Sequence, residues 1–222
     1  MSGIARWNRC CNAVHPSGES LRVSFGVLNL THRNGHEKPE LLAIGERYRV
    51  RIQLNDAGSV FPAGHRVRLG ISTAYWPMVW PGPEQATLQI LGGTLELPFR
   101  PPAAADALLS PLPGPESSPP EKPTLLRRGD MHIERIDRIG LEIGTSGKRH
   151  YHVEDDDPLS AVAELQRTQT MSRDGWQIRI ETQMRLSCTR DAFLLKASLR
   201  AYESEQEVCH REWDRTIARD FL

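Results

Sequence analysis

Apolar and polar residues alternate strictly along residues 176–188, WQIRIETQMRLSC. If this segment is extended, one of its sides carries Trp176, Ile178, Ile180, Thr182, Met184, Leu186 and Cys188. A period of two predicts a β-strand with one covered and one solvated face. Similar alternation recurs at residues 21–30, 48–54, 65–73, 86–91, 94–99, 192–202 and 207–217. Short strands separated by Gly, Pro, Asn and Asp predict an all-β fold.

A proline-rich stretch divides this strand pattern into two parts. Residues 100–123 hold eight prolines, which cannot donate to a strand ladder and which favour extended, solvated backbone. We therefore predict a connector over residues 103–123. A β-sandwich is expected before it, over residues 14–102, and a β-rich extension after it, over residues 124–222.

Within the extension, the strand patterns follow one another with short breaks. The breaks TRD at residues 189–191 and ESEQ at residues 203–206 are short enough for hairpins, which predicts an antiparallel meander. Residues 158–168, PLSAVAELQRT, are the only short helix candidate. Residues 144–149, GTSGKR, approach a phosphate-binding loop but lack its first Gly and its final Ser or Thr, so we interpret them as a turn.

Composition excludes several classes of partner. The 28 Lys and Arg residues balance 28 Asp and Glu residues, so no net charge attracts nucleic acid or an anionic membrane. No apolar run approaches the roughly 18 residues of a membrane span, and the opening MSGIARWNRCC does not resemble a signal peptide, so we expect a cytoplasmic protein. The cysteines are too few and too scattered for a disulfide framework or a C-x-x-C zinc pair: Cys10, Cys11, Cys188 and Cys209.

Candidate catalytic residues are weak. The stretch Gly70 to Ala74 approaches the G-x-S-x-G elbow around Ser72, but it ends in Ala and continues into Tyr-Trp-Pro rather than a helix. His65 could act as a base, yet no nucleophile is identifiable for it, and a structural role before the next strand is favoured. We expect no catalytic site in this chain.

Two histidine clusters contain side chains that can bind metal ions. His32 and His36 lie beside Glu37, but Asn-Gly between the histidines favours a turn over the helix that H-E-x-x-H chemistry needs. His150 and His152 precede Glu154 and an acidic run, which is more typical of a solvated charged loop. We therefore expect no metal and no cofactor.

Residues 61–80, FPAGHRVRLGISTAYWPMVW, pass from a strand pattern into a corner rich in aromatic rings and prolines. Val67, Leu69 and Ile71 alternate with polar residues or glycine, as in a half-buried strand. The corner that follows offers an interface or a ligand-facing surface, carried by Tyr75, Trp76 and Trp80.

Several segments together resemble the C-terminal β-sandwich of the X-Pro dipeptidyl-peptidase and cocaine-esterase family of serine hydrolases. They are GVLNLTHR at 26–33, GERYRVRIQLND at 45–56, FPAGHRVRLGISTAYWPMVWPGPE at 61–84 and LELPFRPP at 95–102. The resemblance implies a jelly-roll-like, galactose-binding-like sandwich over residues 14–102. It is expected to be N-terminally incomplete, because MSGIARWNRCC does not look like the strand that the family would place there.

In that family an α/β-hydrolase domain with a Ser, Asp and His triad precedes the sandwich. The resemblance therefore implies a non-catalytic domain that is inactive alone, with the Trp-Pro corner as packing or domain interface. Its expected partner is a separate or lost α/β-hydrolase domain, with self-association as the other outcome. The alternative function is a stand-alone module that binds carbohydrate or another apolar ligand through Tyr75, Trp76 and Trp80.

Overall fold

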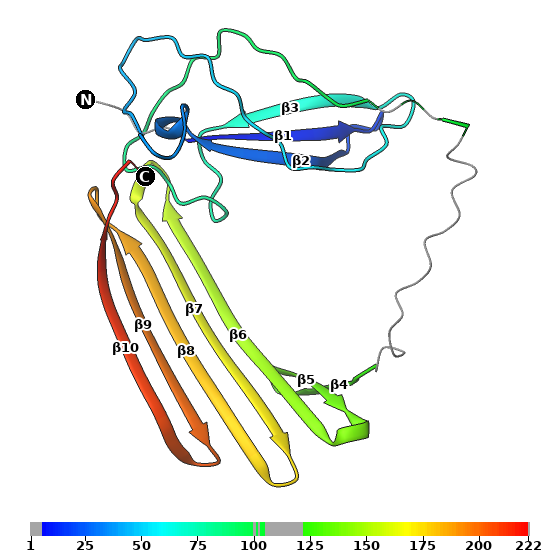
Figure 1. The fold of residues 1–222 in the computed structure, drawn as a ribbon, viewed down its shortest axis with the longest axis vertical. Helices are drawn as coiled ribbons and strands as arrows, with labels where there is room; N and C mark the ends of the chain where they lie inside the picture. Colours follow the sequence, from blue (N-terminus) through cyan, green and yellow to red (C-terminus); the bar gives the residue numbers. More distant parts are fainter. Residues whose placement is uncertain (1–5, 100, 102, 105–121, 222) are drawn as a thin grey trace.

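The computed structural model describes residues 6–99, 101, 103–104 and 122–221. Apart from short 3-10 turns, the regular structure in these ranges is β-strand, arranged in two antiparallel sheets (Figure 1). The all-β class, a sandwich-type part followed by a meander, is thereby confirmed. The predicted connector over residues 103–123 lies almost entirely outside the described residues.

The first sheet has three strands, with β1 (Arg6–Val14) between β2 (Ser20–Asn29) and β3 (Arg66–Ser72). β1 pairs antiparallel with both neighbours. Cys11, for example, lies opposite Ser24 of β2 and opposite Leu69 of β3. Residues 6–11, which do not look like the strand that the family would place there, nevertheless begin the central strand of this sheet. Its C-terminal half contributes the buried residues Cys11, Ala13 and Val14 to the core.

Irregular segments cover this small sheet in place of further paired strands. Residues 48–54, 86–91 and 94–99, predicted as strands, belong to no sheet. In residues 48–54, the predicted alternation of covered and exposed residues is nevertheless present. The residues between the covered side chains are exposed, and the covered side chains are all half-buried: Tyr48, Val50, Ile52 and Leu54. The alternation therefore reports burial against the sheet, not hydrogen bonding within one.

One close approach holds the covering segment against β2. Asn55 N donates to Phe25 O at 2.9 Å, and Ser24 Oγ donates to Asn55 O at 2.6 Å. A Cβ on the buried Gly26 would lie 2.1 Å from the carbonyl oxygen of Gln53. Glycine is required here because the two backbones meet where a side chain would stand.

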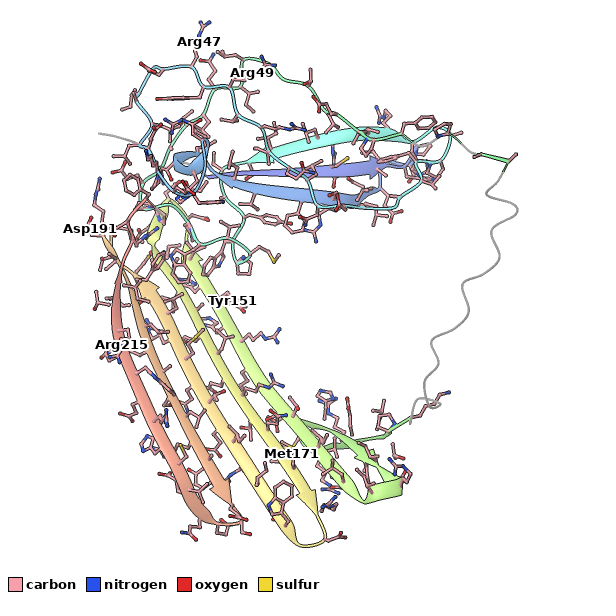
Figure 2. The ribbon with its side chains drawn as sticks, viewed as in Figure 1. Arg47, Arg49, Tyr151, Met171, Asp191 and Arg215 are labelled. Atoms are coloured by element: carbon pink, nitrogen blue, oxygen red, sulfur yellow. The ribbon has the colours of Figure 1, made fainter. Side chains whose placement is uncertain are left out.

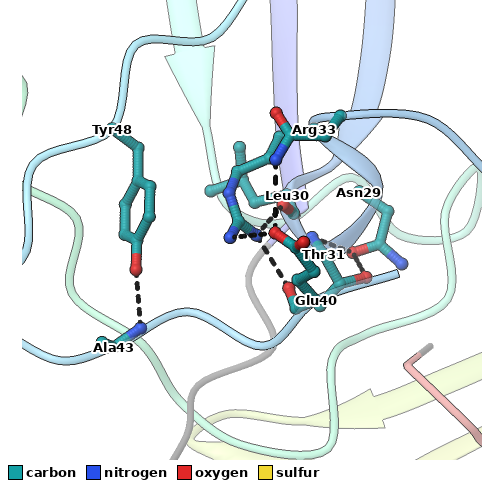
Figure 3. Close-up of polar contacts among 8 residues, drawn as sticks. Asn29, Leu30, Thr31, Arg33, Glu40, Ala43 and Tyr48 are labelled. Atoms are coloured by element: carbon teal, nitrogen blue, oxygen red, sulfur yellow. Dashed lines mark hydrogen bonds and ion pairs between the residues drawn. The ribbon is translucent and has the colours of Figure 1, made fainter. Parts of the chain in front are cut away.

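Arg33 anchors the beginning of the same segment. It follows the 3-10 turn η1 (Leu30–His32), and its side chain is mostly buried. The guanidinium donates to the backbone oxygen of Glu40 at 2.7 Å, pairs with the Glu40 carboxylate at 3.0 Å and lies 4.6 Å from the ring centre of Tyr48 (Figure 3). This contact brings residues far along the loop back to the end of β2.

The second sheet is a seven-stranded meander in the order β10-β9-β8-β7-β6-β5-β4. Its strands are β4 (Thr124–Arg128), β5 (Met131–Ile136), β6 (Leu141–Glu154), β7 (Asp157–Arg173), β8 (Trp176–Cys188), β9 (Ala192–Glu203) and β10 (Gln206–Ala218). The strand predicted at 176–188 coincides with β8. Strands β6 to β10 run side by side away from the first sheet (Figure 1).

Two local predictions in this region are wrong. Residues 158–168 are not a helix but the first part of β7, and residues 144–149 are not a turn but the middle of β6. Gly144 is a glycine because a Cβ there would lie 2.3 Å from Thr170 Oγ1 and 2.5 Å from Met131 Sδ. The β4–β5 hairpin folds closely onto the sheet at this point, which explains a glycine inside a strand.

Asp137 stabilises the connection between β5 and β6. It begins the 3-10 turn η3 (Asp137–Ile139) and accepts hydrogen bonds from Thr124 Oγ1 and from Arg135 Nε, both at 2.6 Å. These two hydrogen bonds hold the pKa of the Asp137 carboxyl below its ordinary value.

The two faces of the second sheet differ in chemistry. Residues directly opposite in antiparallel strands share a face, and the register places one set of apolar side chains together. We call this set the apolar face: Tyr151, Ala163, Leu165, Met171, Ile178, Ile180, Met184, Leu186, Cys188, Phe193, Leu195, Ala197, Leu199, Ala201, Trp213 and Ile217. The other face carries cross-strand ion pairs, among them Arg185 with Glu164 and Lys196 with Asp214.

Candidate functional site

The aromatic corner leaves the end of β3 and turns back on itself. Tyr75 and Val79 form an isolated antiparallel bridge, with Val79 N donating to Tyr75 O at 2.9 Å. The Trp76–Pro77 peptide bond inside this turn is cis. The rings of Trp76 and Trp80 meet edge to face, with centroids 5.0 Å apart and planes at 85°.

Trp76 and Trp80 contact the second sheet at the near end of its apolar face. The Trp76 ring lies 6.0 Å from that of Tyr151 and the Trp80 ring 5.7 Å from that of Phe193, both edge to face. Trp80 Nε1 donates to Cys188 Sγ at 3.3 Å. Such aromatic pairs contribute about 0.5–1.5 kcal/mol each beyond the area they bury.

Arg219 ties the C-terminal end of the chain to the same corner. The residue is only 3% exposed, and its guanidinium donates to Pro81 O at 2.7 Å and to Thr189 O at 3.1 Å. It also lies 4.7 Å from the ring centre of Phe193. Burial lowers the pKa of this arginine, whose charge is retained because arginine remains protonated far above neutrality.

Further polar contacts join the two sheets around the corner. The backbone oxygen of Phe221 accepts from Asn29 Nδ2 at 2.6 Å and from Thr31 Oγ1 at 3.0 Å. Arg190 and Glu84 form an ion pair across the junction. Thr31 is buried, and the hydrogen bond to Phe221 keeps its hydroxyl paired. The contact between the two sheets therefore has a polar part beside its aromatic part.

Tyr75 turns the other way, onto the first sheet. Its hydroxyl accepts a hydrogen bond from Arg22, and its ring lies 6.1 Å from that of Phe25. The structure therefore brings Trp76 and Trp80 together between the two sheets but separates Tyr75 from them.

Ser72 and His65 lie at opposite ends of β3 and cannot act together. Seven residue steps of extended chain separate them, which is about 23 Å. Ser72 Oγ donates to Ala74 O at 2.7 Å and accepts from Ala74 N, a local turn contact. The buried Nδ1 of His65 has no hydrogen-bond partner, and its ring packs at 5.0 Å against His15.

The two histidine pairs each bring their rings close together, and the Glu164 carboxylate lies 3.5 Å from His150 Nδ1. His32 Nδ1 and His36 Nδ1 lie 2.9 Å apart, and the rings of His150 and His152 stack with centroids 6.3 Å apart. In the described part of the chain, no group of three or more His, Cys, Asp or Glu side chains is placed to hold a metal ion. The described residues also include no helix long and apolar enough to cross a membrane.

An open cavity of about 2250 Å³ lies between the first sheet and its irregular cover. The sheet contributes Cys11 and Val23 to its wall, and residues 42–61 and 86–99 supply most of the rest. Burial raises the pKa of the Cys11 thiol, which keeps it neutral and unreactive. The cavity has a mixed polar and apolar wall, and the thiol that it contains is not activated.

Sequence reasoning identified the tryptophans but not what they touch. Tyr151, Cys188 and Phe193 lie from 75 to 113 residues away in the sequence from the tryptophan that each contacts, and no local pattern connects them with the corner. Arg219 follows the last strand, where a charged residue is ordinary, so nothing in the sequence indicates its burial.

Comparison with known proteins agrees with the expected resemblance. Residues 11–111 match the family model of the X-Pro dipeptidyl-peptidase C-terminal non-catalytic domain. A cocaine esterase from Rhodococcus sp. (strain MB1 Bresler) is 30% identical over 64 residues, which span 29% of this chain and 11% of that relative. No solved structure matches significantly. The matched range begins inside β1 and ends before β4, so the large sheet lies outside it.

Proposed function

We propose that this chain, whose residues 11–111 match the family model of the X-Pro dipeptidyl-peptidase C-terminal non-catalytic domain, acts as the non-catalytic part of a serine hydrolase. In this proposal it works beside an α/β-hydrolase domain that carries the nucleophile, the base and the oxyanion hole. The family match is the observation that carries the proposal.

The placement of candidate catalytic groups supports it. A nucleophile and its base must lie within hydrogen-bond reach, whereas Ser72 and His65 occupy opposite ends of one strand. The described residues contain no α-helix, and an α/β-hydrolase domain cannot be assembled from antiparallel strands alone. Hydrolysis therefore has to be performed by another polypeptide segment.

For the aromatic corner we propose a role as the joint between the sheets. A platform for a sugar needs an aromatic face open to solvent, but Trp76 and Trp80 pack edge to face against each other and against the second sheet. This packing favours the interface role over the carbohydrate-binding module. Tyr75 braces the base of the corner through Arg22.

A cytoplasmic location is also part of the proposal. Cys11, Cys188 and Cys209 are free thiols. Unpaired thiols suit a reducing compartment, in which disulfides rarely form.

The experiment is co-expression with the α/β-hydrolase polypeptide encoded in the same or the neighbouring reading frame. We expect the two to copurify, and hydrolysis of a p-nitrophenyl ester or a Gly-Pro-anilide to depend on the hydrolase serine. An active hydrolase that neither binds this chain nor changes in activity or stability with it would contradict the proposal. So would a genome without any such reading frame.

A further inference from the structure

The aromatic corner covers only the near end of the apolar face. From Leu186 to Ile178 along β8 there are eight residue steps, or about 27 Å, and no described element crosses this stretch (Figure 1). Figure 2 shows Tyr151 near the covered end and Met171 towards the far end. The uncovered region continues the packed junction directly, with the same kind of side chains.

Four arginines border this uncovered strip. Arg149 lies opposite Leu165, and Arg167 opposite Thr182, which places both on the apolar face along β6 and β7. On the other flank, β10 contributes two more to the same face, Arg211 opposite Leu199 and Arg215 opposite Leu195. All four are exposed. The central strands β8 and β9 thus form an apolar strip between two rows of guanidinium groups.

These charges are not balanced within the described chain. No described carboxylate pairs with any of the four guanidiniums, and the acidic residues of β6 to β10 on this face, Glu154, Asp157 and Glu203, lie at strand ends. The opposite face, in contrast, pairs several of its charges across strands, as between Arg185 and Glu164 and between Lys196 and Asp214. The asymmetry indicates that carboxylates for the apolar face come from outside.

We propose that this face docks a partner polypeptide whose apolar ridge is flanked on both sides by carboxylates. The ridge would lie along β8 and β9, and the flanking carboxylates would meet Arg149 and Arg167 on one side and Arg211 and Arg215 on the other. Arginine suits this role because its planar fork binds carboxylates bidentately. The inference concerns strands outside the family-matched range and does not depend on the partner being a hydrolase.

The strip on β8 and β9 is two strand widths of about 4.8 Å wide and about 27 Å long, which gives roughly 260 Å² in projection. The whole face from β6 to β10, arginine rows included, covers roughly 500 Å². A partner that fills this face would therefore contact the apolar strip and both charged borders together.

Charge argues against a second copy as the occupant. Two copies packed face to face would bring arginine rows together with no carboxylate between them, which costs energy at close range. A flat bilayer is disfavoured because Trp76 and Trp80 of the aromatic corner pack onto one end of the face. A ridge-shaped polypeptide can lie along the rest of it.

The test uses the full chain and two synthetic amphipathic helical peptides. Both carry the same leucine ridge, flanked in one by glutamates and in the other by lysines. We expect fluorescence anisotropy to show at least tenfold tighter binding of the glutamate peptide, weakening as salt rises. Equal affinity for both peptides, or no binding of either, would overturn the proposal.

Variants locate the binding face. The double variant Arg211→Glu/Arg215→Glu should weaken the glutamate peptide at least tenfold, while Arg200→Glu, on the opposite face of β9, should change it less than twofold. If the first variant fails to fold, the milder double variant Arg211→Gln/Arg215→Gln should also weaken binding of the glutamate peptide. Unchanged binding by the folded double variant refutes the assignment. Light scattering that shows a dimer broken by Met184→Gln, or flotation with anionic vesicles, would assign the face to a second copy or to a membrane instead.

Discussion

Removal of the Trp80 side chain should loosen the junction between the two sheets. The side chain packs edge to face with Trp76 and Phe193 and donates to Cys188 Sγ. Burial losses for Trp→Ala in a core are about 3–5 kcal/mol. Because Trp80 is half-buried, we expect the lower end for Trp80→Ala, about 3 kcal/mol of unfolding free energy. For a chain of this length that corresponds to a fall in Tm of about 6–12 °C.

The measurement is urea and thermal denaturation followed by circular dichroism, with Trp176→Ala as the matched control. Trp176 begins β8 at the end away from the corner and is 45% exposed, so its replacement should cost under about 1 kcal/mol. If both variants lose the same small amount of stability, Trp80 does not hold the sheets together and the proposed joint is refuted.

Three further predictions follow from individual contacts. Gly26→Ala should lower the free energy of unfolding by about 1–3 kcal/mol in urea titrations, because its Cβ would overlap the Gln53 carbonyl. The control Gly58→Ala, whose Cβ would have nothing within 4 Å, should be near neutral, and equal effects of the two variants would contradict the close approach. Arg219→Leu should cost about 2–4 kcal/mol in the same titration by leaving the Pro81 and Thr189 carbonyls unpaired, and a neutral result would argue against the clamp. The lowered pKa of Asp137 gives stability that is complete above about pH 4 and lost as pH falls through that pKa, so the Tm advantage of wild type over Asp137→Asn should shrink below pH 4; an advantage constant down to pH 2 would contradict this.

Sequence patterns predicted strands where alternation was long and its covered face was apolar. β8 agrees with its prediction because apolar side chains occupy nearly every second position over its whole length. The first part of β7 was predicted as a helix and not as a strand, because it is rich in Ala and Leu, which favour helices. Its Ala161 and Ala163 still alternate in the strand sense, and both are buried. Their small size is explained by tertiary packing, which a local window does not contain.

Other errors have similar physical causes. Residues 48–54 alternate correctly but join no ladder, since alternation measures which side is covered and not which backbone groups pair. Gly144 suggested a turn, but it is small because Met131 and Thr170 occupy the adjacent space. The corner was recognisable from its rings and prolines, whereas its contacts with Tyr151 and Phe193 depend on the assembled sheet.

The central claim, that the chain contributes no catalytic serine, is tested most directly by its own hydrolytic activity. The purified protein should be assayed with p-nitrophenyl esters and Gly-Pro-anilide, with and without a serine-directed inhibitor, beside Ser72→Ala as a control. We predict no inhibitor-sensitive turnover in either protein, because Ser72 and His65 stand at opposite ends of β3. Inhibitor-sensitive turnover that disappears in Ser72→Ala would contradict the account.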